Sequence, residues 1–478
     1  MDKHYERTLN LLNKEVRRDH RSLRNRLQSI LLDHKFLDEL VLSVFPNFPV
    51  VPNERCGLWY CDPSSFCQTS YFKSTDGHTN QWDFSVRRLN VHLLPTLAKY
   101  GGIVIVDSTR RGKKMPDALS KTVPIWCAVL NSLMLEFLNR TDEEVLFCPP
   151  HTVSRQEYVQ IKAKIPLLVD KLKAMGVITG EELAKLNQGK ILRPLWVYPG
   201  SSLLSSHQDL FTGETTSAEW ESPDTDHLIP VVLCTVSYQC QDGVDNRHGF
   251  TYVQGAADDH ELWAKGLTAE MLWDHIEFLR NPKASDQALD EYISTQLKAK
   301  KASVNASGNL NDIINTDVIT KELRLGRIAE NVKLSKCLQQ QLCAAYCLVI
   351  IMSESVELSG TEEDKNSTIR VIKLSSGSKK SSKSLRAQLI NLCPLIESNL
   401  HKRLPILVCC GDGKDMSLCV LLSVLCRNYN VESWELEQQS SIHKTIIRKH
   451  LSKVVAKLEG RNVNPPRASL NSVNAYLM

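Results

Sequence analysis

The residues best suited to chemistry lie between positions 101 and 127, where an apolar run ends in an acid and a basic turn. Residues 103–106 are all apolar, which is typical of a short buried strand, and Asp107 follows them directly. The next residues combine hydroxyl groups, cations and a glycine: Ser108, Thr109, Arg110, Arg111, Gly112, Lys113 and Lys114. Hydroxyls and cations bind phosphate oxygens, and glycine lets the backbone approach a ligand closely. The turn is therefore predicted to bind phosphate, with a solvated basic turn as the alternative.

A second candidate cluster follows the strand that ends at Tyr252 and Val253. A turn of small residues leads into four adjacent ionisable side chains, Asp258, Asp259, His260 and Glu261. Adjacent carboxylates suit a general base or an Mg²⁺ ion, which prefers oxygen ligands. An acidic helix start, favoured by the helix dipole, is the alternative. We predict four catalytic residues, of which Asp107 and Asp258 are also the predicted Mg²⁺ ligands: Asp107, Asp258, Asp259 and His260.

Two further basic groups are also candidates. Lys73 and His78 flank a polar turn and are predicted to contact a second phosphate or a ribose, although turn formation alone explains the residues between them. Near the start of the chain, Arg17, Arg21 and Arg24 fall on one face of a predicted helix. Such a face could follow an RNA phosphate backbone, or it could simply be solvated.

The segment CCGDGKDMS at 409–417 joins an apolar strand to an apolar helix. It resembles the phosphate loop of the cysteine-dependent phosphatases, in which a thiolate, five residues and then an arginine with serine or threonine surround a phosphate. Met416 stands at the arginine position and Cys409 at the histidine position, so the loop lacks the guanidinium that clamps phosphate and supports the thiolate. We therefore expect a phosphatase-like fold without hydrolysis. Its backbone amides still suit an anion, and the predicted anion-binding residues are Cys410, Gly411, Asp412, Gly413, Lys414 and Ser417.

The elements that position these residues predict an α/β protein. Strands are expected at 103–106, 195–198 and 229–236, and a second α/β unit has strands at 346–352, 368–374 and 405–409 with a helix at 385–400. Residues 281–312 have the composition of a linker. We predict three parts: a mixed α/β catalytic domain at 1–280, a linker with a connecting helix at 281–340, and a smaller α/β domain of cysteine-phosphatase-like fold at 341–478.

Composition restricts the class of protein. The chain has 478 residues, 42% of them hydrophobic, which is enough for two or three domains with their own cores. Its 58 basic and 54 acidic residues give a net charge of +4, so a nucleic-acid surface must be a local patch. Fifteen cysteines without an apolar leader, and no apolar run near the roughly 18 residues that span a bilayer, predict a cytoplasmic protein with free thiols and no membrane partner.

Taken together, these and other segments resemble one family, the initiator-tRNA phosphoribosyl transferases of fungi and plants. The matching stretches cover nearly the whole chain: RCGLWY at 55–60, YFKSTDGH at 71–78, IVDSTRRGKKMPDALSKTVPIWC at 105–127, PPHTVS at 149–154, VYPGSS at 197–202, YVQGAADDHELW at 252–263, CCGDGKDMS at 409–417 and RASLNSVNAYLM at 467–478. The resemblance implies transfer of a 5-phosphoribosyl group from 5-phosphoribosyl 1-pyrophosphate to the 2′-hydroxyl of a T-stem purine ribose. The implied partner is initiator methionine tRNA, which the mark bars from elongation; no DNA partner is expected.

This reaction needs cations at the departing pyrophosphate and an acid group at the 2′-hydroxyl. The first role falls to the basic turn after Asp107, and the second to Asp107, Asp258 or Asp259, which the sequence does not separate. The usual donor-binding motif of common phosphoribosyl transferases, a strand ending in paired acids, is missing from the sequence, so their fold is not assumed. Two other classes stay open: a cysteine-dependent protein or RNA phosphatase, and a tRNA-binding protein without catalysis. The oligomeric state is not predicted.

Overall fold

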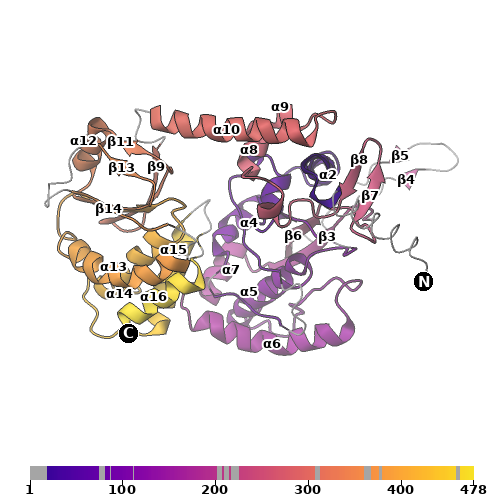
Figure 1. Ribbon diagram of the computed structural model, residues 1–478. Helices are drawn as coiled ribbons and strands as arrows, with labels where there is room; N and C mark the ends of the chain where they lie inside the picture. The colour runs from indigo at the N-terminus through magenta and orange to yellow at the C-terminus, as the bar shows by residue number, and fades with distance from the viewer. Residues whose placement is uncertain are drawn as a thin grey trace, which may run out of the picture. The chain divides into compact units, whose positions relative to one another are not determined.

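The computed structural model divides the chain into two compact units (Figure 1). The N-terminal unit comprises Met1–Ser85 and Asn90–Thr295, and the C-terminal unit comprises Val86–Leu89 and Gln296–Met478. The structure describes residues 19–74, 81–86, 88–110, 112–201, 207–208, 215–216, 226–306, 313–359, 368–375, 379–458, 463 and 465–478. Arg17, His78 and Arg111, three of the predicted site residues, lie outside this described part.

The N-terminal unit is built on a four-stranded parallel sheet in the order β1-β2-β6-β3. The strands are β1 (Val50–Pro52), β2 (Ile103–Asp107), β3 (Ile191–Val197) and β6 (Leu228–Thr235). All five residues of β2 are buried, because a central parallel strand is covered on both faces. The predicted strands at 103–106, 195–198 and 229–236 correspond to β2, β3 and β6.

Helices and two short hairpins complete this unit. The helices are α2 (Leu23–Phe36), α3 (Leu42–Val44), α4 (Leu94–Tyr100), α5 (Val123–Phe137), α6 (Arg155–Lys173), α7 (Gly180–Asn187), α8 (Ala269–Asp274) and α9 (Ile276–Leu279). The hairpin strands are β4 (His207–Gln208), β5 (Thr215–Thr216), β7 (Val244–Arg247) and β8 (Phe250–Val253). Five residues in π-helical form join α2 to α3 and another five precede α5.

Helix α5 follows the basic turn and anchors it in the core. With its π-helical start it forms the 20-residue segment Ala118–Phe137, of mean hydropathy 1.3 and 83% buried. Within the described part of the chain, this segment is long and apolar enough to cross a membrane. The buried core helix of a globular protein can have the same length and hydropathy. The burial of α5 against α6 and α7 identifies it as a core helix.

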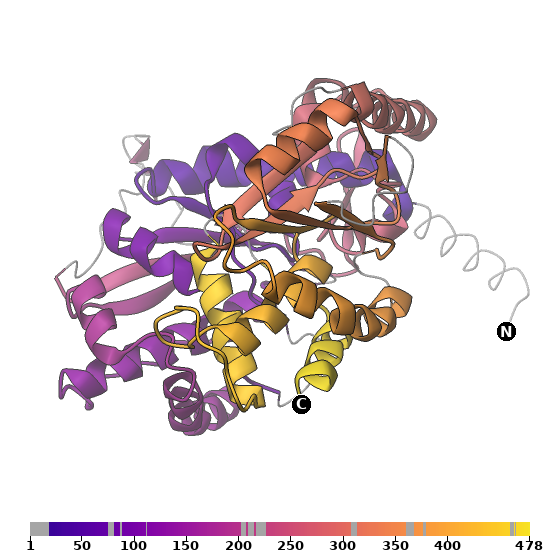
Figure 2. The ribbon, with the colours of Figure 1, turned by 90° about the vertical axis from the view of Figure 1, so that its left-hand side faces the viewer.

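The C-terminal unit contains a five-stranded sheet in the order β14-β12-β15-β10-β9, parallel except for β9. Its strands are β9 (Ile314–Val318), β10 (Leu323–Ile328), β12 (Leu348–Met352), β14 (Ile369–Ile372) and β15 (Ile406–Cys410), and β11 (Lys333–Leu334) pairs separately with β13 (Glu357–Leu358). Its helices are α12 (Lys336–Ala345), α13 (Lys379–Glu397), α14 (Met416–Asn428), α15 (Lys444–Lys457) and α16 (Arg467–Leu477). Figures 1 and 2 show α13 to α16 gathered on one face of the sheet and α12 on the other.

The region predicted as linker and connecting helix, 281–340, is more structured than we expected. It contains the 21-residue helix α10 (Asp286–Ala306), within which the two units divide, and both β9 and β10. The C-terminal sheet therefore begins before the predicted boundary at 341. Strand β9, INTDV, has an exposed, polar composition because it is an antiparallel edge strand, which hides it from a search for apolar runs.

The packing of α7 against α5 leads to a stability prediction at Gly180. A Cβ atom at this position would lie 2.5 Å from the carbonyl oxygen of Leu133 and 2.8 Å from Cβ of Phe137. We expect Gly180→Ala to lower the free energy of unfolding by roughly 1–3 kcal/mol, because backbone must move to admit the methyl group. Chemical denaturation measures this change. Lys185→Ala, on the exposed side of α7, is the control and should cost less than about 1 kcal/mol; equal costs would contradict the packing argument.

Candidate active site

The candidate active site lies at the carboxyl edge of the N-terminal sheet. Since its strands are parallel, the residues that follow them meet at one edge. Asn53 follows β1, Asp107 ends β2, and Ser237 lies just beyond β6. The Ser237 hydroxyl accepts a hydrogen bond from the Thr109 amide and donates one to the Thr109 carbonyl, both at 3.0 Å. Thr109, at the start of the basic turn, is thus hydrogen-bonded to the loop that follows β6.

Asp107 is fully buried and both of its carboxylate oxygens are engaged. Oδ2 accepts hydrogen bonds from Asn53 Nδ2 at 2.8 Å and from Arg55 Nε at 3.1 Å. Oδ1 accepts from Arg55 Nη2 at 3.2 Å and from the Ser108 amide at 2.8 Å. Arg55 therefore clamps Asp107 with two parallel hydrogen bonds, the strongest geometry for this pair. In this arrangement Asp107 is a structural anchor, and its oxygens face protein donors instead of a ligand.

Arg55 also connects Asp107 to the second acidic cluster. Its Nη1 lies 3.1 Å from Asp258 Oδ1, which also accepts a hydrogen bond from the Cys56 thiol at 2.6 Å. Burial disfavours the charge of Arg55, but the carboxylates of Asp107 and Asp258 outweigh it and raise its pKa. Burial raises the pKa of the Cys56 thiol well above its ordinary value, so the thiol is a neutral donor. The two predicted acidic groups are thus brought together by one guanidinium.

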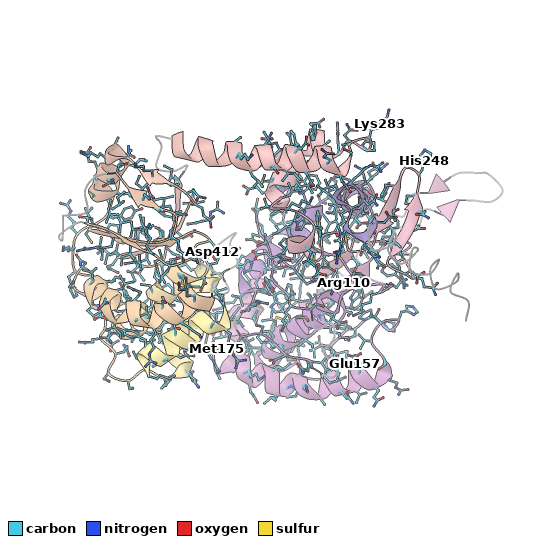
Figure 3. The ribbon with its side chains drawn as sticks, viewed as in Figure 1. Arg110, Glu157, Met175, His248, Lys283 and Asp412 are labelled. Carbon is cyan, nitrogen blue, oxygen red and sulfur yellow. The ribbon has the colours of Figure 1, made fainter. Side chains whose placement is uncertain are left out.

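The basic turn reaches the same cluster through Arg110. Its guanidinium pairs with Asp259, and its Nε lies 3.9 Å from Asp258 Oδ2. Side chains of Arg110 and Asp259 are 57% and 56% exposed, so this pair is open to solvent (Figure 3 labels Arg110). Exposed pairs are weak and easily exchanged. An incoming phosphate group can therefore compete with Asp259 for Arg110.

Gln254 holds the middle of the basic turn. Its buried carboxamide oxygen accepts hydrogen bonds from the amides of Gly112 at 2.9 Å and Cys240 at 3.0 Å, and its nitrogen donates to the Lys113 carbonyl at 2.7 Å. Lys113 itself is exposed, and Lys114 Nζ lies 4.2 Å above the ring of Tyr198, which follows β3. The described cations of the turn therefore lie around the sheet edge, on a backbone fixed by one amide side chain.

The acidic loop is fixed from the opposite side by its backbone. Arg26 Nη1 donates to the carbonyls of Ala256 at 2.7 Å and Asp258 at 3.0 Å, and the Tyr60 hydroxyl accepts from the Ala257 amide at 3.2 Å. Gly255 has φ +65°, and a Cβ there would lie 2.9 Å from the Thr109 carbonyl oxygen. The acidic loop and the basic turn are in direct backbone contact only because this residue lacks a side chain.

The remaining predicted residues of this unit lie differently. His260 is partly exposed beside Trp59, with ring centroids 5.8 Å apart, and belongs to the same loop as the two aspartates. Lys73 is exposed, and its carbonyl accepts a hydrogen bond from Thr122 at 2.8 Å. The Arg24 guanidinium donates to the carbonyls of Pro282 and Gly249, at 2.8 and 2.6 Å. Arg24 thus has backbone partners within the protein, while Arg21 is exposed. With Arg17 outside the described residues, the RNA-binding role of these three arginines stays a prediction.

Three residues central to this site were not among the predicted site residues: Asn53, Arg55 and Gln254. Arg55 begins the RCGLWY segment, but it follows no apolar run, and nothing local distinguishes it from a surface arginine. Gln254 is a neutral residue in a turn. A signal was present only for Asn53, which directly follows β1 and therefore lies at the carboxyl edge of the sheet.

The predicted metal ligands do not fit a metal at Asp107. Its two oxygens already accept four hydrogen bonds, and Arg55 places a cation where a metal ion would stand. Among the residues that the structure describes, no group of three His, Cys, Asp or Glu side chains is placed to hold a metal ion. The Mg²⁺ prediction stays a prediction, and no step below depends on it.

In the C-terminal loop, residues 410–417, the side chains bond to one another and to the backbone amides of the loop. Cys410 ends β15, and its sulfur lies 3.0 Å from Ser417 Oγ and 3.1 Å from Asp412 Oδ1. That same Asp412 oxygen accepts hydrogen bonds from the amides of Lys414 at 2.9 Å and Asp415 at 3.3 Å. Asp412 (labelled in Figure 3) therefore supplies its own carboxylate to amides that we predicted would bind a phosphate. An external anion would have to displace it.

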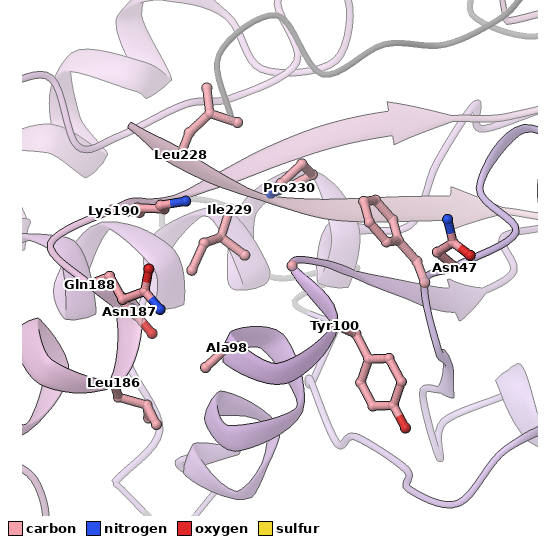
Figure 4. Close-up of a pocket in the computed structure, with 12 residues that line it drawn as sticks. Asn47, Ala98, Tyr100, Leu186, Asn187, Gln188, Lys190, Leu228, Ile229 and Pro230 are labelled. Carbon is pink, nitrogen blue, oxygen red and sulfur yellow. The ribbon is translucent and has the colours of Figure 1, made fainter. Parts of the chain in front are cut away.

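A separate pocket of about 390 Å³ opens at the opposite, amino edge of the N-terminal sheet (Figure 4). It is bordered by residues just before β1 and β2 and at the start of β6, including Phe48, Gly101 and Ile229. Its polar lining consists of amides, a tyrosine hydroxyl and Lys190, without a carboxylate or a histidine. It lacks the groups that the predicted chemistry needs, so we retain the carboxyl edge as the candidate site.

The fold and these sites define a class: a two-unit α/β protein with a cation and carboxylate cluster in one unit and a phosphatase-like strand, loop and helix in the other. Comparison with known proteins is more specific. A family model described as the Rit1 N-terminal domain matches residues 16–298, and one described as the Rit1 DUSP-like domain matches residues 368–477. The chain therefore belongs to the Rit1 family, which confirms the family and the α/β fold predicted from the sequence.

Two relatives match over nearly their whole lengths. The chain is 52% identical to a Saccharomyces cerevisiae protein named tRNA A64-2'-O-ribosylphosphate transferase, over 100% of this chain and 96% of that protein. It is 35% identical to an uncharacterized protein of Schizosaccharomyces pombe, over 95% of this chain and 94% of that protein.

The Arg55 clamp leads to a prediction about its geometry. Arg55→Lys keeps one positive charge but loses the planar fork that reaches both carboxylates. We expect it to destabilise the fold by roughly 1–3 kcal/mol, because one ammonium group leaves buried carboxylate oxygens without their hydrogen-bond donors. Thermal and chemical unfolding measure this change. The matched control is Arg193→Lys, a half-buried arginine on β3 that has no carboxylate partner in the described residues; an equal loss there would contradict the clamp.

The closed C-terminal loop leads to a second prediction. We expect the full-length protein to release no phosphate from an aryl phosphate above the level of a Cys410→Ser variant, because the arginine is missing and Asp412 fills the loop. Release is followed by absorbance of the freed phenol. Turnover that depends on Cys410 would restore the phosphatase alternative.

Proposed function

We propose that this protein transfers a 5-phosphoribosyl group from 5-phosphoribosyl 1-pyrophosphate to the 2′-hydroxyl of a T-stem purine ribose in cytoplasmic initiator methionine tRNA. The observation that carries the proposal is 52% identity over the entire chain to a protein named tRNA A64-2'-O-ribosylphosphate transferase. Matches to both Rit1 domains support it further. The protein is thus an enzyme, a transferase that acts on tRNA with a phosphoribosyl pyrophosphate donor. Selection of the initiator tRNA and cytoplasmic location are the finer parts of the proposal.

The site geometry supports a division of labour for this reaction. When the anomeric carbon loses pyrophosphate, negative charge develops on the leaving group and must be balanced by cations. Among the residues that the structure describes, the exposed Arg110 pairs with the solvent-accessible Asp259 and, more distantly, with Asp258, so we assign it to the pyrophosphate. Lys113 and Lys114, on the same fixed turn, add positive charge.

We assign the proton transfer to Asp258. Its Oδ1 is held by Arg55 and Cys56, whereas Oδ2 has only the Arg110 nitrogen 3.9 Å away among the described residues. In the proposed step, Oδ2 takes the proton of the ribose 2′-hydroxyl, the 2′-oxygen bonds to the anomeric carbon, and the bond from that carbon to pyrophosphate breaks. Asp107 takes no proton in this scheme. It positions Arg55, which in turn positions Asp258.

Mass spectrometry of initiator tRNA after incubation with the donor tests the proposed reaction. The wild type should add one phosphoribosyl group, and Asp258→Asn should reduce the rate by about 100-fold or more, because asparagine keeps the hydrogen bonds but cannot accept the proton. Glu261→Gln, in the same loop with a side chain 75% exposed, is the matched control and should retain activity.

Three results would count against this scheme. An unmodified tRNA with the wild-type protein would refute the transferase and leave the non-catalytic tRNA-binding alternative. Full activity in Asp258→Asn would refute the assigned base alone. Equal losses in both variants would show that any change in this loop is harmful, and would remove the support for Asp258.

A further inference from the structure

The DUSP-like segment has a net positive charge, whereas the rest of the protein has a net negative charge. Residues 368–477 contain 17 lysines and arginines and 7 acids, a net charge of +10, whereas the rest of the chain contains 41 basic and 47 acidic residues, a net charge of −6. The overall charge of +4 hides this division. Local excess of this kind is the electrostatic signature of a polyanion-binding surface.

Within this segment, helix α13 presents the clearest row of cations. Lys380, Lys383 and Arg386 are exposed and follow one another at intervals of three residues, so they are neighbours on one side of the helix. The opposite side is buried through residues such as Leu385 and Leu389. None of the three cations pairs with a carboxylate in the residues that the structure describes.

Among the described residues, few acids lie near this row. Glu397 is the one acidic residue of α13, lies at its last position, and is bonded to Arg427 Nε at 2.7 Å. The neighbouring helix α16 has no acidic residue and begins with the exposed Arg467. The two helices touch at the cationic end of α13, where the hydroxyls of Ser382 and Ser469 lie 3.1 Å apart. Glu354, which accepts a hydrogen bond from Ser375 at 3.4 Å, is a carboxylate near the start of α13.

An ordinary solvated helix in this protein looks different. On α6 the exposed lysines are matched by carboxylates: Lys162 pairs with Glu144, Lys171 with Asp83 and Lys173 with Glu136. Matched charges keep a surface soluble without attracting a polyanion. The unmatched row on α13 therefore calls for a negatively charged partner.

We propose that the face formed by Lys380, Lys383 and Arg386 of α13, with Arg467 of α16, binds the phosphate backbone of the tRNA substrate. This inference rests on the proposed function for the identity of the RNA. The contacts are ionic and made to phosphates, so they add affinity without reading sequence. The closed loop at Asp412 is not needed for them. The DUSP-like domain is then an RNA-holding element built on a phosphatase-like fold.

The test compares two charge-matched triple variants of the full-length protein. Lys380→Ala/Lys383→Ala/Arg386→Ala removes the proposed row. Lys321→Ala/Lys402→Ala/Arg403→Ala removes two lysines and an arginine that are also exposed but precede β10 and β15, at the amino edge of the same sheet. Both variants lower the net charge by three, so a difference between them reports position and not total charge. Thermal unfolding verifies that each is folded.

The measured quantity is the Kd for labelled initiator tRNA transcript, by fluorescence anisotropy, between about 50 and 200 mM salt. We expect the α13 variant to raise Kd about tenfold or more at the higher salt, and to reduce the slope of log Kd against log salt by about 2 to 3, one for each lost phosphate contact. The control variant should stay within about twofold of the wild type. Similar values for the two variants would overturn the proposal.

The same preparations distinguish this inference from the proposed function. Transfer by the wild type with a raised KM for tRNA in the α13 variant, and an unchanged KM for the donor, supports both. Transfer by the wild type with identical tRNA affinity in both variants refutes only the α13 surface. Absence of transfer in the wild type refutes the proposed function, and the anisotropy comparison then still decides whether this face binds RNA.

Discussion

The candidate site depends on one guanidinium. Arg55 forms a two-point contact with the fully buried Asp107 and a further contact with Asp258, so it joins the end of β2 to a loop that is more than 150 residues later in the chain. A buried carboxylate is costly unless it is paired and hydrogen-bonded. Arg55 therefore compensates the buried charge of Asp107 at the edge of the sheet. Its contact with Asp258 holds that carboxylate in place as well.

This dependence assigns different roles to acids that look equivalent in the sequence. Asp107 has four hydrogen-bond donors and no exposed surface, which suits an anchor. Asp259 is exposed and pairs with Arg110. Asp258 lies between them, with one oxygen fixed and the other near the cation of the basic turn. Gly255 makes this proximity possible, because any side chain there would meet the backbone of Thr109.

Sequence patterns located the framework of the site better than its interactions. Strand β2 was predictable because a buried parallel strand is a continuous apolar run, and the basic turn directly follows it. Arg55 was not, because its importance comes from Asp107, 52 positions away, and its own neighbours show no periodicity. The same limit applies to β9, whose polar residues belong to an edge strand, and to Asp412, whose bonds to loop amides depend on a backbone conformation that residue types alone do not reveal.

The C-terminal unit illustrates how a fold can keep its architecture while its reactive loop loses one function. Replacement of the loop arginine by Met416 removes the cation that would hold both a phosphate and a thiolate, and loop amides without an anion would be unsatisfied. Asp412 supplies that anion from within the chain, which stabilises the loop and also fills it. An external phosphate would have to displace Asp412 from these amides to enter the loop. The excess positive charge of this unit is instead displayed on helix surfaces such as that of α13, where phosphates of a large RNA can reach it without entering a pocket.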